Sequence, residues 1–255
     1  MNFPMNVSIG EFELPLHAVF EFAAFFIGFR YFLFLRKKRS DSISTSNRIW
    51  ILIGAIIGSI IGSRLVGGLE DPEQIKITNN VWMHFYQNKT VLGGFLGGVW
   101  GVEAIKYLLK EKQSSGDLFT YPMILALIIG RIGCFSMGVF EETYGIPTQF
   151  FTGIELGDGV NRHPVTLYEI VFLLFLWIAL AAIEKKQPAR AGLRFKRMMI
   201  AYMVFRFSLD FIKPHYTFSI GLSAIQITCV IGLIYYSIVF LLKKYSNHPN
   251  TQQHA

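Results

Sequence analysis

Apolar runs alternate with short polar segments along almost the whole chain. Each run approaches the roughly 20 apolar residues that a helix needs to cross a lipid bilayer. The pattern predicts an all-α membrane protein with about seven transmembrane helices, because a spanning helix satisfies its own backbone polar groups. The expected spans are Leu14–Leu35, Ile49–Gly67, Val91–Leu109, Leu118–Phe135, Pro164–Ile183, Arg197–Ile212 and Ile220–Leu242.

Lysine and arginine are concentrated in alternate loops between these spans. The first, third and fifth loops and the C-terminal end are rich in basic residues, whereas the other loops contain only Lys76, Lys89, Arg162 and Lys213. Cytoplasmic loops of membrane proteins carry the basic excess, so we expect the N-terminus outside and the C-terminus in the cytoplasm. We expect residues 1–244 to form a single polytopic transmembrane domain, followed by a polar cytoplasmic tail at 245–255.

The composition favours a membrane protein over a nucleic-acid-binding one. Charged residues make up 16% of the chain and the mean hydropathy is +0.41, whereas a soluble domain is roughly 25% charged. A net charge of +7 could attract nucleic acid, but the basic residues lie in loops and no base-reading motif accompanies them. We therefore expect no nucleic-acid partner. Cys134 and Cys229 lack metal or disulfide spacing, which suggests small buried side chains.

Two neighbouring spans carry rows of glycine at four-residue steps. The rows are Gly54, Gly58 and Gly62 in the second span and Gly93, Gly97 and Gly101 in the third. Rows of small residues let membrane helices approach closely, so a helix–helix seam is the first interpretation. The alternative is that Leu92–Gly98 lines a cavity for a lipid chain or a peptide.

Charged residues at membrane depth form three closely spaced pairs. The pairs are His17 and Glu21, Glu103 and Lys106, and Arg206 and Asp210. Residues three or four apart share a helix face, so each pair can form a local bridge. His17 and Glu21 could alternatively relay protons, and the Arg206–Asp210 pair could instead hold the arginine ready for an anion.

Arginine ends the fourth span, where Tyr121–Ile129 leads into Gly130 and Arg131. An arginine at this depth is costly unless it snorkels or meets an anion. The predicted topology places further cations in the same outer half, namely Arg64, Arg162, Arg206 and Lys213. Arginine clusters suit phosphate because they bind it bidentately, and a phospholipid headgroup is the natural anion there. After Arg162, a predicted helix start carries His163, Tyr168 and Glu169. These side chains could form a polar pocket, or they could cap the helix and anchor it at the membrane interface.

Three motifs together resemble those of the prolipoprotein diacylglyceryl transferases. They are GRIGCF at Gly130–Phe135, YGIPT at Tyr144–Thr148 and RHPVTLYE at Arg162–Glu169. FRFSLDFIKPH at Phe205–His215 and GLSAIQ at Gly221–Gln226 are similar to later segments of that family. The resemblance implies seven spans in the bacterial cytoplasmic (inner) membrane, with a site towards the outer, periplasmic half.

The resemblance also implies a reaction that uses no cofactor and no metal. Such enzymes move the diacylglyceryl group of phosphatidylglycerol to the lipobox cysteine thiol of a prolipoprotein and release glycerol phosphate. By resemblance Arg131 and Arg206 are catalytic candidates, and His163 joins them as our candidate base because it lies at a predicted helix start near Arg162. The expected headgroup-binding residues are Arg131, Arg162, Arg206, Tyr168 and Glu169. We expect Arg131, Arg206, and Arg162 or His163 to converge on one cavity.

The chain departs from the family pattern at several polar positions. Cys134 replaces an asparagine, Met137 and Val139 replace two further polar residues, and Leu96 replaces a histidine proposed as a base. His163, His17 or Glu169 would then have to activate the thiol, and we place His163 first. The alternative is that the substrate thiol loses its proton elsewhere. The alternatives are a related membrane transferase or hydrolase acting on another anionic lipid or acceptor, and a lipid-binding membrane protein without chemistry.

Overall fold

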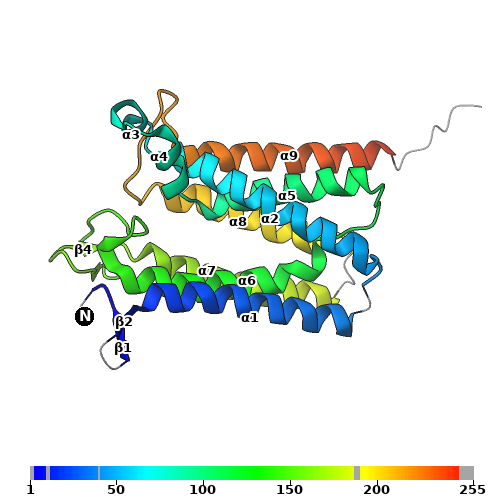
Figure 1. Cartoon of the computed structure of the whole chain (residues 1–255), viewed down its shortest axis with the longest axis horizontal. Helices are drawn as coiled ribbons and strands as arrows, with labels where there is room; N and C mark the ends of the chain where they lie inside the picture. Colours follow the sequence, from blue (N-terminus) through cyan, green and yellow to red (C-terminus); the bar gives the residue numbers. More distant parts are fainter. Residues whose placement is uncertain (1–2, 10–11, 40, 187–189, 247–255) are drawn as a thin grey trace, which may run out of the picture.

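Seven long helices run side by side in a bundle (Figure 1). The computed structural model describes residues 3–9, 12–39, 41–186 and 190–246. Within these residues the long helices are α1 (Leu16–Lys38), α2 (Thr45–Gly68), α5 (Val91–Leu108), α6 (Thr120–Met137), α7 (Val165–Lys186), α8 (Leu193–Asp210) and α9 (Ala224–Ser246). Five described segments, containing α1, α2, α6, α7 and α9, are long and apolar enough to cross a membrane. The expected all-α membrane protein is confirmed at this level.

The connections between the long helices lie at two opposite ends of the bundle (Figure 1). The end with the N-terminus carries the strands, the short helices α3 (Pro72–Ile77) and α4 (Val81–Gln87), and the connection from α8 to α9. The opposite end carries the α1–α2 and α5–α6 connections and the end of α9. The predicted tail at 245–255 lies, from residue 247 onward, outside the described residues.

The two glycine rows form a close helix–helix seam between α2 and α5. A Cβ atom added to Gly58 would lie 2.9 Å from the carbonyl carbon of Gly97, and one added to Gly62 would lie 2.9 Å from the Cα of Gly97. At the far end of the seam, a Cβ on Gly54 would lie 2.8 Å from the oxygen of Gly101. The small-residue interpretation is therefore confirmed, because no larger side chain fits between these backbones.

The structure adds elements that the apolar pattern did not predict. Two short antiparallel hairpins form, β1 (Asn6–Ile9) with β2 (Phe12–Pro15) and β3 (Ile154–Glu155) with β4 (Asn161–Arg162). The predicted second loop contains α3 and α4, and the side chains of Asp71 and Asn80 cap their first turns. Asparagine and aspartate caps are readable signals, but helices of six and seven residues are too short to show a period.

Candidate functional site

Two arginines from different helices meet one carboxylate inside the bundle. Arg131 Nε on α6 lies 2.9 Å from Glu169 Oε2 on α7, and Arg206 Nη1 on α8 donates a hydrogen bond to the same oxygen at 3.2 Å. The Tyr202 hydroxyl donates to the other carboxylate oxygen, Glu169 Oε1, at 2.7 Å. Three helices are thereby joined at a single charged cluster, which we call the Glu169 cluster and which consists of these four residues.

The Glu169 cluster is almost completely buried. Glu169 and Tyr202 are each 1% exposed, Arg131 is 8% exposed and Arg206 is 7% exposed. Buried charges are stable only when they are paired and hydrogen-bonded. Two guanidinium groups face one carboxylate, so the four side chains together carry one excess positive charge. An anion that reached this point would balance that charge.

The helix ends place these side chains by close backbone packing. A Cβ on Gly133 would lie 2.9 Å from the Phe20 Cβ, so glycine is what lets the end of α6 approach the start of α1. On the other side, Pro164 precedes α7, and its carbonyl accepts the amide hydrogens of Leu167 and Tyr168. Proline suits this position because it has no amide hydrogen to leave unpaired. The next residue along α7 is Glu169.

Arg162, His163 and Tyr168 form a second group of contacts beside the start of α7. His163 Nδ1 lies 3.2 Å from the Tyr168 hydroxyl, which also bonds to Thr152. Arg162 pairs with Asp158 at 2.7 Å and lies over the Tyr144 ring. The Arg162 guanidinium is the first cause of a lowered pKa of Asp158. The structure thus brings Arg131 and Arg206 together, while the contacts of Arg162 and His163 are with other residues.

Arg206 and Asp210 do not form the local bridge that was one of two alternatives from the sequence. Arg206 turns to Glu169, and Asp210 instead accepts a hydrogen bond from the Ser223 hydroxyl. The other two predicted pairs form: His17 Nε2 lies 3.7 Å from Glu21, and Lys106 Nζ lies 3.2 Å from Glu103.

A small polar cavity lies at the end of the bundle that carries the N-terminus. Glu70, Asp210, Lys213 and His215 contribute to its wall. Burial raises the pKa of the Glu70 carboxyl to about 7, although Lys213 opposes the shift. Burial also lowers the pKa of Lys213. Both groups are thereby shifted towards their neutral forms.

A third group of polar side chains surrounds His17 and contacts Arg131 through Cys134. Arg131 Nη1 lies 3.5 Å from Cys134 Sγ, and His17 Nδ1 lies 3.2 Å from Glu141 Oε2. Donor atoms of His17, Cys134 and Glu141 lie within 4.8 Å of one another. Sequence reasoning missed this group because His17 lies more than 100 residues before Cys134 and Glu141. It interpreted Cys134 as a packing residue. Tyr202 was missed as well, since one tyrosine in an apolar helix gives no signal.

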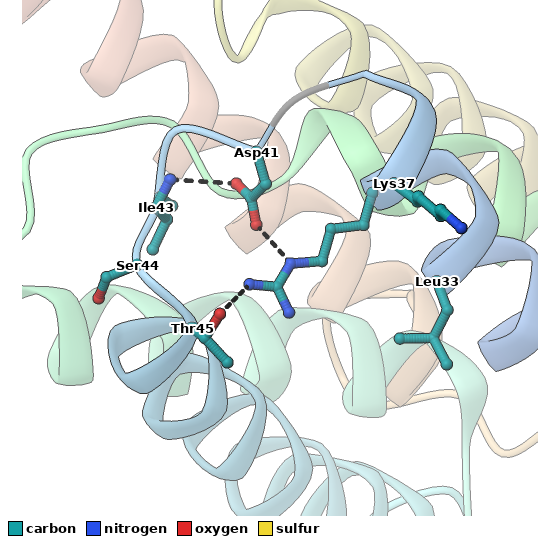
Figure 2. Close-up of a pocket in the computed structure, with 7 residues that line it drawn as sticks. Leu33, Lys37, Asp41, Ile43, Ser44 and Thr45 are labelled. Carbon is teal, nitrogen blue, oxygen red and sulfur yellow. Dashed lines mark hydrogen bonds and ion pairs between the residues drawn. The ribbon is translucent and has the colours of Figure 1, made fainter.

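Another hollow lies at the connection between α1 and α2. It measures about 540 Å³, and Leu33, Lys37, Asp41 and Thr45 contribute to its wall (Figure 2). Arg36 also lines it and donates hydrogen bonds to Asp41 and Thr45, both at 3.1 Å. This hollow contains none of the predicted site residues, so its size does not make it the candidate site.

The fold and this site define a class: a multi-pass helical membrane protein with a buried pair of arginines on one carboxylate. Residues 4–242 match the family described as prolipoprotein diacylglyceryl transferase, and the chain belongs to this family. Membership in this bacterial family, together with several apolar helices, makes it a multi-pass inner-membrane protein and a transferase.

Relatives from several bacteria carry the same name, phosphatidylglycerol–prolipoprotein diacylglyceryl transferase. The chain is 28% identical over 222 residues to the protein of Rickettsia canadensis, and the aligned region covers 82% of this chain and 83% of the relative. It is 28% identical over 225 residues to that of Bordetella parapertussis, with 82% of each chain covered. It is 29% identical over 211 residues to that of Campylobacter hominis, covering 78% of this chain and 74% of the relative.

Proposed function

We propose that this chain transfers the diacylglyceryl group of phosphatidylglycerol to the lipobox cysteine of a prolipoprotein. The acceptor sulfur attacks the carbon of the diacylated glycerol that is bonded to the phosphate oxygen. A carbon–sulfur bond forms, and the bond between that carbon and the phosphate oxygen breaks. Glycerol phosphate leaves with the electron pair, and the thiol proton passes to a base. The observation that supports this reaction best is the meeting of Arg131 and Arg206 at one buried carboxylate.

Arg131 and Arg206 would stabilise the phosphate as it leaves. The leaving group gains negative charge, and fixed guanidinium groups in a site that excludes water stabilise such charge strongly. Glu169 would hold both arginines in place before the lipid binds, since its Oε2 contacts both of them. When the phosphate arrives, the two guanidinium groups can share it with the carboxylate, because the cluster carries one excess positive charge.

The second group of contacts would receive the polar part of the substrates. Arg162, His163 and Tyr168 lie beside Glu169 in sequence, and Tyr168 joins His163 to the start of α7. We propose that Arg162 and Tyr168 contact the headgroup glycerol. His163 is one candidate base for the thiol. His17 is the other, because a donor atom of Cys134 lies within 4.8 Å of one of His17 and Cys134 contacts Arg131, which would bind the phosphate.

We propose seven spans, with the N-terminus outside and the C-terminus in the cytoplasm. The separation of the connections into two ends (Figure 1) and the basic residues of alternate loops support this orientation. The Glu169 cluster then lies in the outer, periplasmic half, where prolipoproteins emerge. We also propose that residues 1–244 act as a single domain and that nucleic acid is not a partner.

Complementation tests the proposed function directly. Cells depleted of their own transferase would express the wild-type chain, the Arg131→Ala variant or the matched variant Arg30→Ala, which alters an exposed arginine on α1. We expect the wild-type chain and Arg30→Ala to clear the accumulated prolipoprotein and Arg131→Ala to leave it. Accumulation with all three chains would refute the transfer. Release of glycerol phosphate from labelled phosphatidylglycerol without a lipobox peptide would indicate a hydrolase instead.

A further inference from the structure

The group formed by His17, Cys134 and Glu141 offers three different metal-binding atoms at one point. The imidazole, the thiol and the carboxylate come from the start of α1, the end of α6 and the segment after the short helix η2 (Gly138–Phe140). Their donor atoms all lie within 4.8 Å of one another. Nitrogen, sulfur and carboxylate ligands together are typical of zinc and of related transition metals, whereas Mg²⁺ and Ca²⁺ prefer oxygen alone.

The distance between two of these atoms already suits a tetrahedral ion. His17 Nδ1 and Glu141 Oε2 are 3.2 Å apart, and ligands held about 2.0–2.1 Å from zinc at tetrahedral angles are about 3.3 Å apart. Both atoms are buried, and among the described residues neither has a hydrogen-bond partner of acceptable geometry. A proton on Nδ1 would make this contact an ion pair, and a metal ion between the same two atoms would take the place of that proton.

The surroundings match those of an ion-binding histidine. His17 Nε2, the ring nitrogen on the far side, lies 3.7 Å from Glu21 Oε2, and metal-binding histidines commonly direct their second nitrogen at a carboxylate. Lys89 holds Glu21 in turn, with 3.0 Å between Nζ and Oε1. Arg131 lies 3.5 Å from Cys134 Sγ and offers a positive charge to a thiolate.

We propose that His17, Cys134 and Glu141 bind one zinc ion or a similar divalent transition metal, and that the acceptor cysteine thiol takes the fourth position. The second half of this proposal rests on the proposed function. Three protein ligands leave one position of a tetrahedral ion open, as in catalytic zinc sites. A thiol bound there loses its proton outright, so the metal would supply the thiolate that a base must otherwise produce.

The charges of such a site balance. The ion carries two positive charges, and the Cys134 thiolate and the Glu141 carboxylate cancel them. The acceptor thiolate adds one negative charge, which Arg131 is placed to offset. The sulfur of the acceptor thiolate would attack the carbon of the diacylated glycerol that is bonded to the phosphate oxygen. The carbon–sulfur bond would form, the carbon–oxygen bond would break, and glycerol phosphate would leave towards Arg131 and Arg206. The thiol proton would go to solvent when the thiol binds the ion.

Metal content and cobalt spectra test the site without measuring activity. The full chain would be purified in detergent, stripped with a chelator and titrated with Zn²⁺ or Co²⁺. We expect about one ion per chain and, with Co²⁺, the charge-transfer absorption of a cobalt–thiolate bond. Cys134→Ser should abolish that band and Glu141→Gln should weaken ion binding, whereas the matched variant Cys229→Ala should retain both. Glu21→Gln should lower the affinity about 10- to 100-fold.

A second arm tests the acceptor position. A lipobox peptide should increase the cobalt–thiolate absorption, and the same peptide with serine in place of cysteine should not. An unchanged spectrum with both peptides would overturn the acceptor half of the proposal. Circular dichroism and size-exclusion profiles would show that each variant is folded, and a folded wild-type chain that binds no ion would overturn the site itself.

The outcomes separate this proposal from the proposed function. Full transfer by a chelator-treated chain would refute the role of the metal and leave the transfer standing. Stoichiometric cobalt binding by a chain that transfers no lipid would refute the transfer and leave the metal site standing.

Discussion

Replacing Glu169 by glutamine is the most informative single change, because it removes one negative charge between two buried cations. Glu169→Gln keeps the size and shape of the side chain. It leaves the guanidinium groups of Arg131 and Arg206 without their carboxylate partner at 2.9 and 3.2 Å. It also turns an acceptor oxygen into an amide that can donate hydrogen bonds. We therefore expect a folded but strongly destabilised protein.

The structure sets the size of the effect. Breaking a buried ion pair by removing one partner costs about 3–5 kcal/mol, and Glu169 is 1% exposed with partners at 8% and 7%. We expect Glu169→Gln to lower the free energy of unfolding by at least about 3 kcal/mol. The matched variant is Glu103→Gln, since that carboxylate is 53% exposed beside Lys106. Exposed pairs are worth only about 0.2–1 kcal/mol.

Unfolding in mixed micelles with increasing dodecyl sulfate, followed by circular dichroism, measures both free energies. The same measurement in phosphatidylglycerol and in phosphatidylcholine micelles tests the anion site. An anionic headgroup that reaches the freed guanidinium groups should restore about 1.5–3 kcal/mol to Glu169→Gln. Equal losses for Glu169→Gln and Glu103→Gln would refute the energetic argument. Equal losses of Glu169→Gln in both lipids would refute access of the headgroup to the cluster.

Three further predictions concern activity, packing and pH. Arg131→Lys should lower lipid transfer about 10²- to 10³-fold, nearly as much as Arg131→Ala, because an ammonium group cannot bind a phosphate bidentately; labelled lipid transfer measures this. Gly97→Val should prevent folding, as monitored by size-exclusion chromatography. Gly130→Ala should be tolerated, because a Cβ atom on Gly130 would lie 4.0 Å from the Ala24 Cβ. The pKa of Glu70 is about 7 in the folded protein against an ordinary 4.5, so the folded state binds more protons than the unfolded state between these values. Thermal unfolding should therefore show stability falling from about pH 5 to 7, and Glu70→Gln should remove that fall.

Periodic features of the sequence predicted the bundle well. Each predicted span overlaps one long helix of the described residues, and five of these helices lie in segments long and apolar enough to cross a membrane. The glycine rows form the seam. The boundaries moved where polar residues extend a helix beyond its apolar part: α8 begins at Leu193, four residues before the predicted span. α9 begins at Ala224 rather than Ile220, because the Ser223 side chain bonds to the amide of Gln226 at the first turn.

The site was only partly predictable for a physical reason. Arg131, Arg206 and Glu169 stood out because charge is costly in an apolar span, and all three belong to the cluster. Which residue each arginine would contact depends on tertiary packing. Proximity in sequence favoured Asp210 as the partner of Arg206, but the packing of α7 against α8 presented Glu169. Glu141 gave no signal, since it lies in a polar connection where a carboxylate is ordinary.

The departures from the family pattern become connected once the helices are in place. Leu96, where the resemblance places a histidine, is 2% exposed and belongs to the apolar core with Met203. The position of Leu96 on α5 therefore offers no base. Cys134, where the resemblance places an asparagine, lies instead between Arg131 and His17. The histidine position on α5 is thus apolar in this chain, whereas α6 carries a thiol at a position where the family has an asparagine. The groups that could activate an acceptor thiol therefore lie between α1 and α6, beside Arg131, the arginine that would receive the phosphate.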